Sequence, residues 1–143
     1  MKRFLKFAVV LSLFSFSISP AWSDDLSKLE GKWSVKKNNN EGQPITQIIE
    51  IKKDKFKFSV LGSDDKLRIY AEGNIKLAKL GPFNSIQFLN IKAGATESDV
   101  LPIDDDRASI YMLEDSSWTL ASNLDKDRGD QKPSLDIYKK APK

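Results

Sequence analysis

Short runs in which apolar and polar residues alternate constrain this chain more than any other feature. The clearest run places Phe56, Phe58 and Val60 on one face and two lysines and a serine on the other. Such alternation is typical of a half-buried β-strand. About seven or eight short runs of this kind follow one another, with turns every 8–12 residues or so, and helix periodicity is limited to one turn at residues 24–29. The sequence therefore predicts an all-β protein, an antiparallel barrel or a sandwich.

Turn-forming residues mark where the strands end. Lys53-Asp54, residues 62–65, Gly81-Pro82 and residues 114–116 each separate two alternating runs and predict hairpins.

Three breaks in the alternation are expected to alter the strands locally. The pattern slips at Ile48-Ile49, which predicts a bulge or a change of face, and Gly73 predicts a bend. Within residues 83–92, Ile86 and Phe88 share one face while Leu89 and Ile91 share the other, so the register is expected to shift there.

The N-terminal region has the features of a secretory signal. Basic residues precede an apolar run at residues 7–18, Pro20 follows, and Ala21 and Ser23 place small residues where a signal peptidase reads. The apolar run is short for a membrane span, which argues against a retained anchor. We expect cleavage after Ser23.

The sequence therefore divides into a signal peptide, residues 1–23, and one domain, residues 24–143. The expected location is periplasmic or secreted, with no stable membrane insertion of the mature chain. No cysteine follows the cleavage site, which excludes a lipid-anchored lipoprotein.

The predicted signal peptide and the domain differ in net charge. The chain has 23 basic and 20 acidic residues, and three of the basic residues but none of the acidic ones lie within residues 1–23. The expected mature domain is therefore electrically neutral. A neutral domain gives no support to binding of nucleic acid or an anionic membrane.

The absence of cysteine and histidine removes much of the usual chemistry. With neither residue present, there is no thiol nucleophile, no Ser-His dyad and no ordinary site for zinc, haem or copper. Carboxylates, lysine and tyrosine remain. The sequence predicts a protein that is not an enzyme and carries no cofactor.

The segment Leu29-Glu30-Gly31-Lys32-Trp33 resembles the opening of bacterial lipocalin-like domains, which are small secreted barrels of the calycin type. The resemblance extends to residues 42–45, 110–121 and 135–140. It implies an up-and-down β-barrel, of a type that often keeps a cavity for a ligand. It also implies that Gly31 and Trp33 close one end, and that a basic side chain near the last strand packs over the tryptophan. Lys139 and Arg128 are candidates for that role. The chain is shorter than a typical lipocalin, lacks the usual disulfide and shows no clear C-terminal helix.

Seven residues are candidates for the lining of a pocket for a small apolar or amphipathic ligand. All are large and apolar or aromatic, and lie in predicted strands: Trp33, Phe56, Phe58, Ile69, Phe88, Tyr111 and Trp118. An eight-stranded barrel either holds one small ligand or is filled by its own side chains. Inward aromatic residues are more often core than pocket, which favours a filled interior.

Two other functions stay open. Long loops at residues 93–106 and 123–133 favour a protein-binding module, such as an envelope inhibitor or adaptor, with the barrel as scaffold. A hydrolase with paired carboxylates is less favoured, because no two acidic residues lie in apolar surroundings that would separate their pKa values.

The acidic residues 104–106 and 125–130 fit solvated loops better than a calcium site, so no metal is predicted. We expect a monomer.

Overall fold

A computed structural model describes residues 22–127, 129 and 131–142 of this chain. The predicted signal peptide lies almost wholly outside the described residues. Helix α1 (Trp22–Leu29) is followed by strands β1 (Gly31–Asn38), β2 (Pro44–Lys52), β3 (Lys55–Leu61), β4 (Leu67–Leu80), β5 (Phe83–Gly94), β6 (Leu101–Pro102), β7 (Arg107–Leu113), β8 (Ser117–Ser122) and β9 (Ser134–Lys140).

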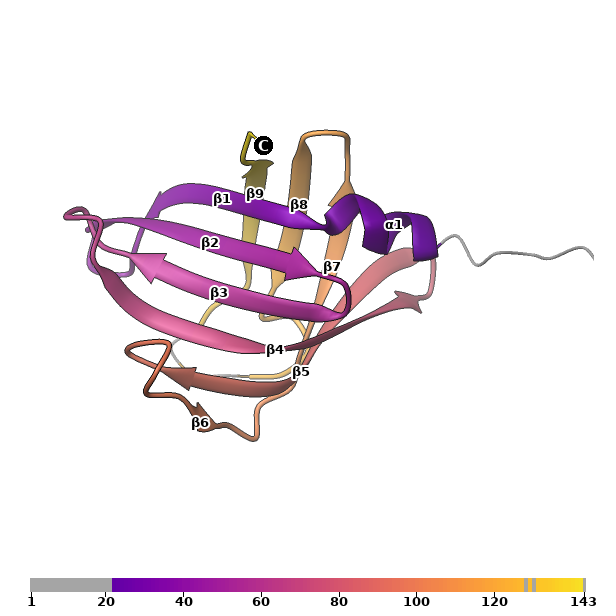
Figure 1. The fold of residues 1–143 in the computed structure, drawn as a ribbon. Helices are drawn as coiled ribbons and strands as arrows, with labels where there is room; N and C mark the ends of the chain where they lie inside the picture. The colour runs from indigo at the N-terminus through magenta and orange to yellow at the C-terminus, as the bar shows by residue number, and fades with distance from the viewer. Residues whose placement is uncertain (1–21, 128, 130, 143) are drawn as a thin grey trace, which may run out of the picture.

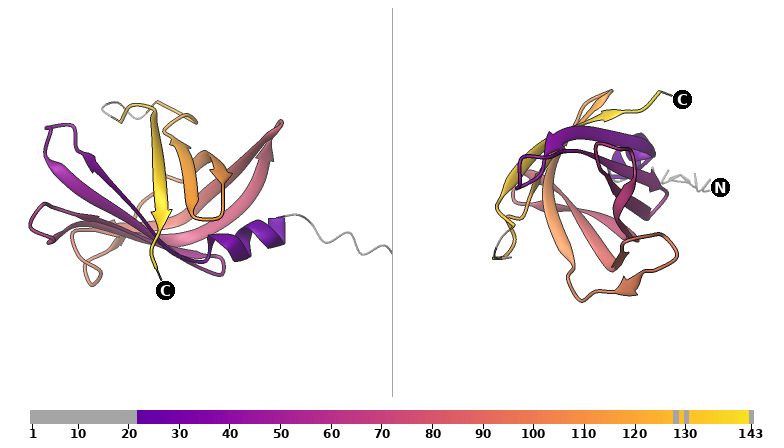
Figure 2. Two further views of the ribbon diagram at one scale, coloured as in Figure 1. Left: turned by 90° about the horizontal axis from the view of Figure 1, so that it is seen from above. Right: turned by 90° about the vertical axis from the view of Figure 1, so that its left-hand side faces the viewer.

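The strands form a closed antiparallel barrel. The strand order is β4-β3-β2-β1-β9-β8-β7-β5-β6, and an additional pairing of β4 with β5 closes eight strands into a ring. Strand β6, the ninth, pairs with Lys92 and Ala93 of β5, beyond the part of β5 that pairs with β7. Figure 2 (right) shows the ring from the end that lies opposite α1. The predicted all-β, up-and-down, lipocalin-like barrel with a short N-terminal helix is confirmed.

The predicted break at Ile48-Ile49 is wrong. Strand β2 pairs in continuous register with both neighbours, so that Ile48 lies between Ser34 of β1 and Ser59 of β3. The side chain of Ile48 therefore stays on the outer face, where it is half-buried, while Ile49 faces the core. A β-branched residue beside two small serines fits the outer face without a bulge.

The predicted irregularities near Gly73 and in residues 83–92 are confirmed as one feature. The β4–β5 register shifts between Glu72 and Asn74, opposite Asn90, whose φ is +52°. This bulge reverses the alternation of β5, so that Ile91 joins Ile86 in the core. Gly73 is needed there because a Cβ would lie 2.5 Å from the carbonyl oxygen of Leu89.

One half of the barrel is filled, at the end where α1 lies (Figure 1). Trp33 and Trp118 are fully buried, with ring centroids 5.7 Å apart in an edge-on arrangement. The indole nitrogen of Trp33 donates a hydrogen bond of 2.8 Å to the carbonyl of Leu29, the last residue of α1. Gly31, with φ +123°, turns the chain between helix and strand.

The basic side chain over Trp33 belongs to Lys140. Its ammonium lies 5.1 Å from the centroid of the Trp33 ring and donates to the carbonyl of Lys28 at 2.9 Å. The prediction of Lys139 is wrong, because residues alternate along β9 and Lys139 pairs with Ser34 on the opposite face. Arg128 lies outside the described residues.

The barrel closes through a short ladder between β1 and β9. Trp33 pairs with Lys140 and Ser34 with Lys139, and Ala141 donates to the carbonyl of Lys32 at 2.8 Å. Beyond Ser34 no further β1–β9 residue pair is formed along these two fully described strands. Side chains alone connect the strands over the rest of their length.

Candidate functional site: a cavity in the open half of the barrel

The half of the barrel away from Trp33 encloses a cavity of about 390 Å³. Its lining comes from β1–β5, β7–β9, the β6–β7 segment and the β8–β9 loop. The apolar residues that line it are aromatic and aliphatic: Ile49, Phe56, Phe58, Val60, Ile69, Ala71, Phe88, Ile91, Ala93, Ile103, Ala108 and Leu120. This volume lies within the range of roughly 300–1,000 Å³ typical of small-molecule sites.

Four of the seven predicted lining residues border this cavity. They are Phe56, Phe58, Ile69 and Phe88, and the rings of Phe56 and Phe88 meet edge to face at 5.0 Å. The other three do not line it.

Trp33, Tyr111 and Trp118 lie in the filled half. The hydroxyl of Tyr111 donates a 2.7 Å hydrogen bond to Asp25 of α1, which fixes the helix to the barrel. Burial and this carboxylate raise the pKa of Tyr111. The indole nitrogen of Trp118 is buried without a hydrogen-bond partner in the part of the chain that the structure describes. These three side chains serve packing and closure.

A polar wall on β1, β2 and β9 faces the apolar part of the cavity. The ammonium of Lys37 lies 2.9 Å from both carboxylate oxygens of Asp136, and both side chains are largely shielded from solvent. Beside this pair, the hydroxyl of Tyr138 donates to the side-chain oxygen of Gln47 at 3.0 Å. Burial, and then the charge of Asp136, raise the pKa of Tyr138, so its phenol stays neutral.

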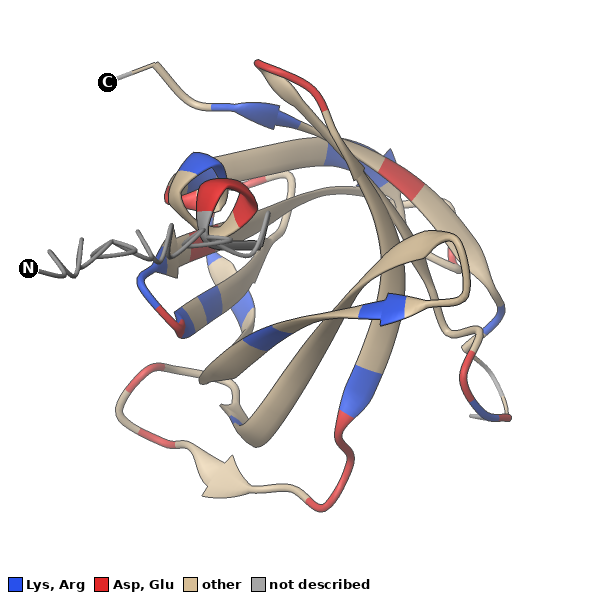
Figure 3. Ribbon diagram, turned by 90° about the vertical axis from the view of Figure 1, so that its right-hand side faces the viewer, with Lys and Arg blue, Asp and Glu red and all other residues tan. Residues whose placement is uncertain are grey.

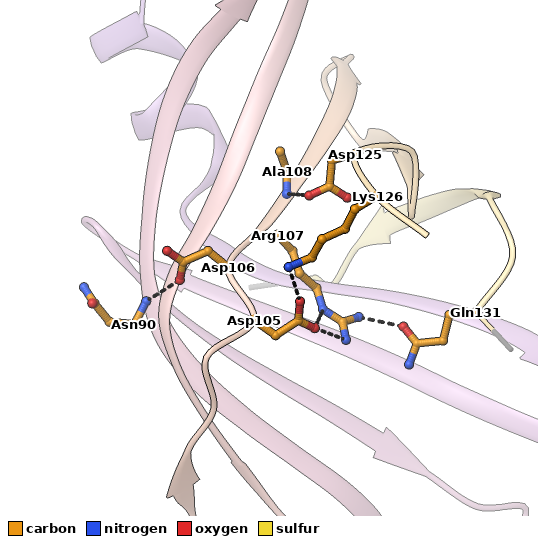
Figure 4. A network of polar contacts seen from close by, with 8 residues as sticks. All are labelled: Asn90, Asp105, Asp106, Arg107, Ala108, Asp125, Lys126 and Gln131. Atoms are coloured by element: carbon orange, nitrogen blue, oxygen red, sulfur yellow. Dashed lines mark hydrogen bonds and ion pairs between the residues drawn. The ribbon is translucent and has the colours of Figure 1, made fainter. Parts of the chain in front are cut away.

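A second polar wall begins at Arg107 on β7 (Figure 4). The Arg107 guanidinium donates to Asp105 at 2.9 and 3.1 Å and to Gln131 of the β8–β9 loop at 3.1 Å. Lys126 lies 2.9 Å from the other oxygen of Asp105. This network links the two long loops, residues 93–106 and 123–133, at the mouth of the cavity.

The loop carboxylates each serve a different partner. Asp106 accepts a hydrogen bond from the backbone of Asn90, and Asp125 accepts one from the backbone of Ala108, both at 3.2 Å (Figure 4). Asp136, on β9, pairs with Lys37. Within the described ranges, no three acidic side chains gather as a metal site.

The sequence analysis missed the polar lining residues Lys37, Gln47, Arg107 and Asp136. A signal for two of them was present. Lys37 lies an even number of residues from Trp33 on β1, and Asp136 an even number from Tyr138 on β9, so each shares the face of that buried aromatic residue. Strand alternation therefore turns both charged side chains toward the interior.

Basic and acidic residues both occur around the barrel in Figure 3, which agrees with their equal numbers in residues 24–143. Among the described residues, no helix has the length and apolar character needed to cross a membrane. Comparisons with protein-family models, curated proteins and solved structures gave no match to this chain.

Proposed function

We propose that this protein is an exported, non-enzymatic binding protein that holds a small amphipathic molecule in its barrel. The observation that carries this proposal is the cavity itself, which is lined by apolar side chains and by two polar walls. Burial of apolar ligand surface supplies affinity at about 25 cal/mol per Å², and a few polar groups fix the orientation. The Gly31–Trp33 closure with Lys140 over the indole supports the relationship to lipocalin-like domains that the sequence suggests.

The proposal is tested by filling the cavity with a larger side chain. Ala71 lies on the cavity wall between Phe58 and Ala93 in the β-sheet register, so Ala71→Phe places a ring where the ligand would lie. Ala121→Phe is the matched control, because Ala121 is on the outer face of β8, opposite the exposed Leu135. A neutral naphthylamine dye, bright only in apolar surroundings, is titrated into each delipidated protein.

The expected result is saturable binding to the wild type and to the control, and at least about tenfold weaker binding to Ala71→Phe. Circular dichroism checks that each variant is folded. Equal binding by all three proteins would rule out the cavity as the site. Tryptophan fluorescence is a poor reporter here, because neither Trp33 nor Trp118 lines the cavity. Native mass spectrometry of protein purified from its own compartment then identifies what is bound.

A second candidate function is a protein-binding module that acts through its loops. The network of Arg107, Asp105, Gln131 and Lys126 holds the two long loops together at one end of the barrel, and such an ordered surface suits recognition of a partner. Shortening the loop within residues 124–127, which do not line the cavity, distinguishes the two functions. Loss of a co-purifying protein partner, with dye binding retained, favours the module; retention of the partner excludes this loop.

A further inference from the structure

We propose that the ligand carries an uncharged head group rich in hydrogen-bond acceptors, such as an ester, amide or alcohol, and not a free carboxylate. This inference rests on the proposed function and concerns the same cavity. It follows from how the charges and hydrogen-bond donors of the polar walls are already used.

Each cation that lines the cavity already has an anionic partner. Lys37 spans both oxygens of Asp136, and Arg107 donates twice to Asp105. A ligand carboxylate that approached Lys37 would meet the carboxylate of Asp136 at close range. Because the pair is shielded from solvent, this like-charge repulsion is weakly screened. The wall that would attract a free acid is therefore neutralised by the protein's own acid.

Donor hydrogens remain free near this pair, beside the lone pairs of Asp136. The ammonium of Lys37 has three hydrogens and uses two on Asp136. The amide nitrogen of Gln47 makes no hydrogen bond within the described residues, while its oxygen is occupied by the hydroxyl of Tyr138. Donors of this kind are satisfied by a carbonyl, ether or hydroxyl oxygen, which brings no net charge.

This polar group and the apolar lining share one cavity. Gln47, Asp136 and Tyr138 border the same cavity as Phe58 and the other inward aromatic side chains. A ligand with its chain against the phenylalanines therefore has its head at the Lys37–Asp136 wall. A neutral head can accept from Lys37 and Gln47 and leave the ion pair intact.

The experiment compares three ligands of one chain length, a fatty acid, its monoglyceride and its alcohol, by displacement of the neutral dye at neutral pH. We expect the wild type to bind the monoglyceride or the alcohol at least about tenfold more tightly than the acid. Asp136→Asn removes the anion beside Lys37 and keeps the side-chain size. Affinity for the acid should then rise at least about tenfold, while affinity for the monoglyceride changes less than about threefold.

Two controls accompany this variant. Asp115→Asn makes the same charge change in the exposed β7–β8 turn and should not alter the preference. Asp136→Glu keeps the charge and should retain the preference for neutral heads, which also covers the case in which Asp136→Asn does not fold. An acid that binds wild type as tightly as the monoglyceride, or an unchanged acid affinity in folded Asp136→Asn, would overturn the inference while leaving the proposed function standing. If no protein binds dye or ligand, the proposed function itself fails, and this inference with it.

Discussion

The ammonium of Lys37 and the carboxylate of Asp136 meet at positions that continue the β1–β9 register beyond its last backbone pair. Trp33 pairs with Lys140 and Ser34 with Lys139, and the same register extended along both strands sets residue 37 opposite residue 136. Beyond the last backbone pair, the Lys37–Asp136 ion pair connects β1 and β9. This pair therefore both closes the barrel and forms part of the cavity wall.

Removal of one partner of this pair should destabilise the protein. Lys37→Met leaves Asp136 shielded and unpaired, and we expect a loss of about 1–3 kcal/mol in the free energy of unfolding by urea titration. Lys37→Met combined with Asp136→Leu should recover most of it. The exposed Arg68–Asp64 pair supplies the control, since Arg68→Met should change stability by less than about 0.5 kcal/mol. Equal effects of the two single changes would argue against a closing role for Lys37.

Trp33→Ala should cost about 3–5 kcal/mol, the range for emptying a buried site of this size. Trp33 is fully buried, makes a hydrogen bond to Leu29 and packs against Trp118. Met112→Ala, on an outward side chain that is 57% exposed, should stay within about 0.5 kcal/mol. Urea melts of both variants measure the difference. A cost below about 1 kcal/mol for Trp33→Ala would contradict its role in closing this end.

Gly73→Ala should destabilise the barrel, although alanine is normally favoured over glycine within a strand. The added Cβ would lie 2.5 Å from the Leu89 carbonyl oxygen and 2.9 Å from the Phe56 ring. A backbone oxygen fixed in a bulge has little freedom to move, so we expect a loss of about 1–3 kcal/mol. Thermal unfolding followed by circular dichroism provides the measurement. A stabilised variant would show that the β4–β5 bulge is looser than described.

All three tyrosines of this chain should ionise only in strong alkali. Burial raises the pKa of each, and the carboxylates near each hydroxyl act in the same direction: Glu72 for Tyr70, Asp25 for Tyr111 and Asp136 for Tyr138. Since the folded state favours the neutral phenol, this stability is present below about pH 10, the unfolded pKa, and is lost as the pH rises through the folded values.

Absorbance at about 295 nm, which reports tyrosinate, measures this titration. We expect little change up to about pH 10, followed by a rise that coincides with loss of the β-sheet circular dichroism signal. The same chain in concentrated urea should titrate near pH 10. A tyrosine that ionises at its ordinary pKa in the folded protein would contradict the burial described for it.

The strands and turns were predictable because alternation reports burial directly. In β3, Phe56, Phe58 and Val60 face inward as their spacing predicts, and the hairpins at Lys53-Asp54 and Gly81-Pro82 fall where predicted. Each of these depends only on local pattern and turn chemistry.

The division of the interior into filled and open halves was not predictable in the same way. Trp118 and Phe88 are both inward aromatic residues, yet only Phe88 borders the cavity. The difference depends on which residues of distant strands lie at the same height along the barrel axis. That is set by strand registers, which the sequence does not reveal. Strand β9 shows the same limit, since Leu135 and Ile137 are exposed while Asp136 faces the cavity.

The short β1–β9 ladder has a consequence for the order of folding. Every other neighbouring pair in the ring joins strands that are close along the chain, but Lys37 and Asp136 are 99 residues apart. Closing so large a loop is entropically costly and slow, and β9 is also the last strand to be synthesised. We therefore expect the other strands to pair into an open, curled sheet before β9 pairs with β1. A circular permutant that joins residue 142 to residue 24 through a flexible linker and opens the loop at residues 123–133 makes the β1–β9 closure local, but it turns the six-pair β8–β9 ladder into the long-range one, so it should fold more slowly.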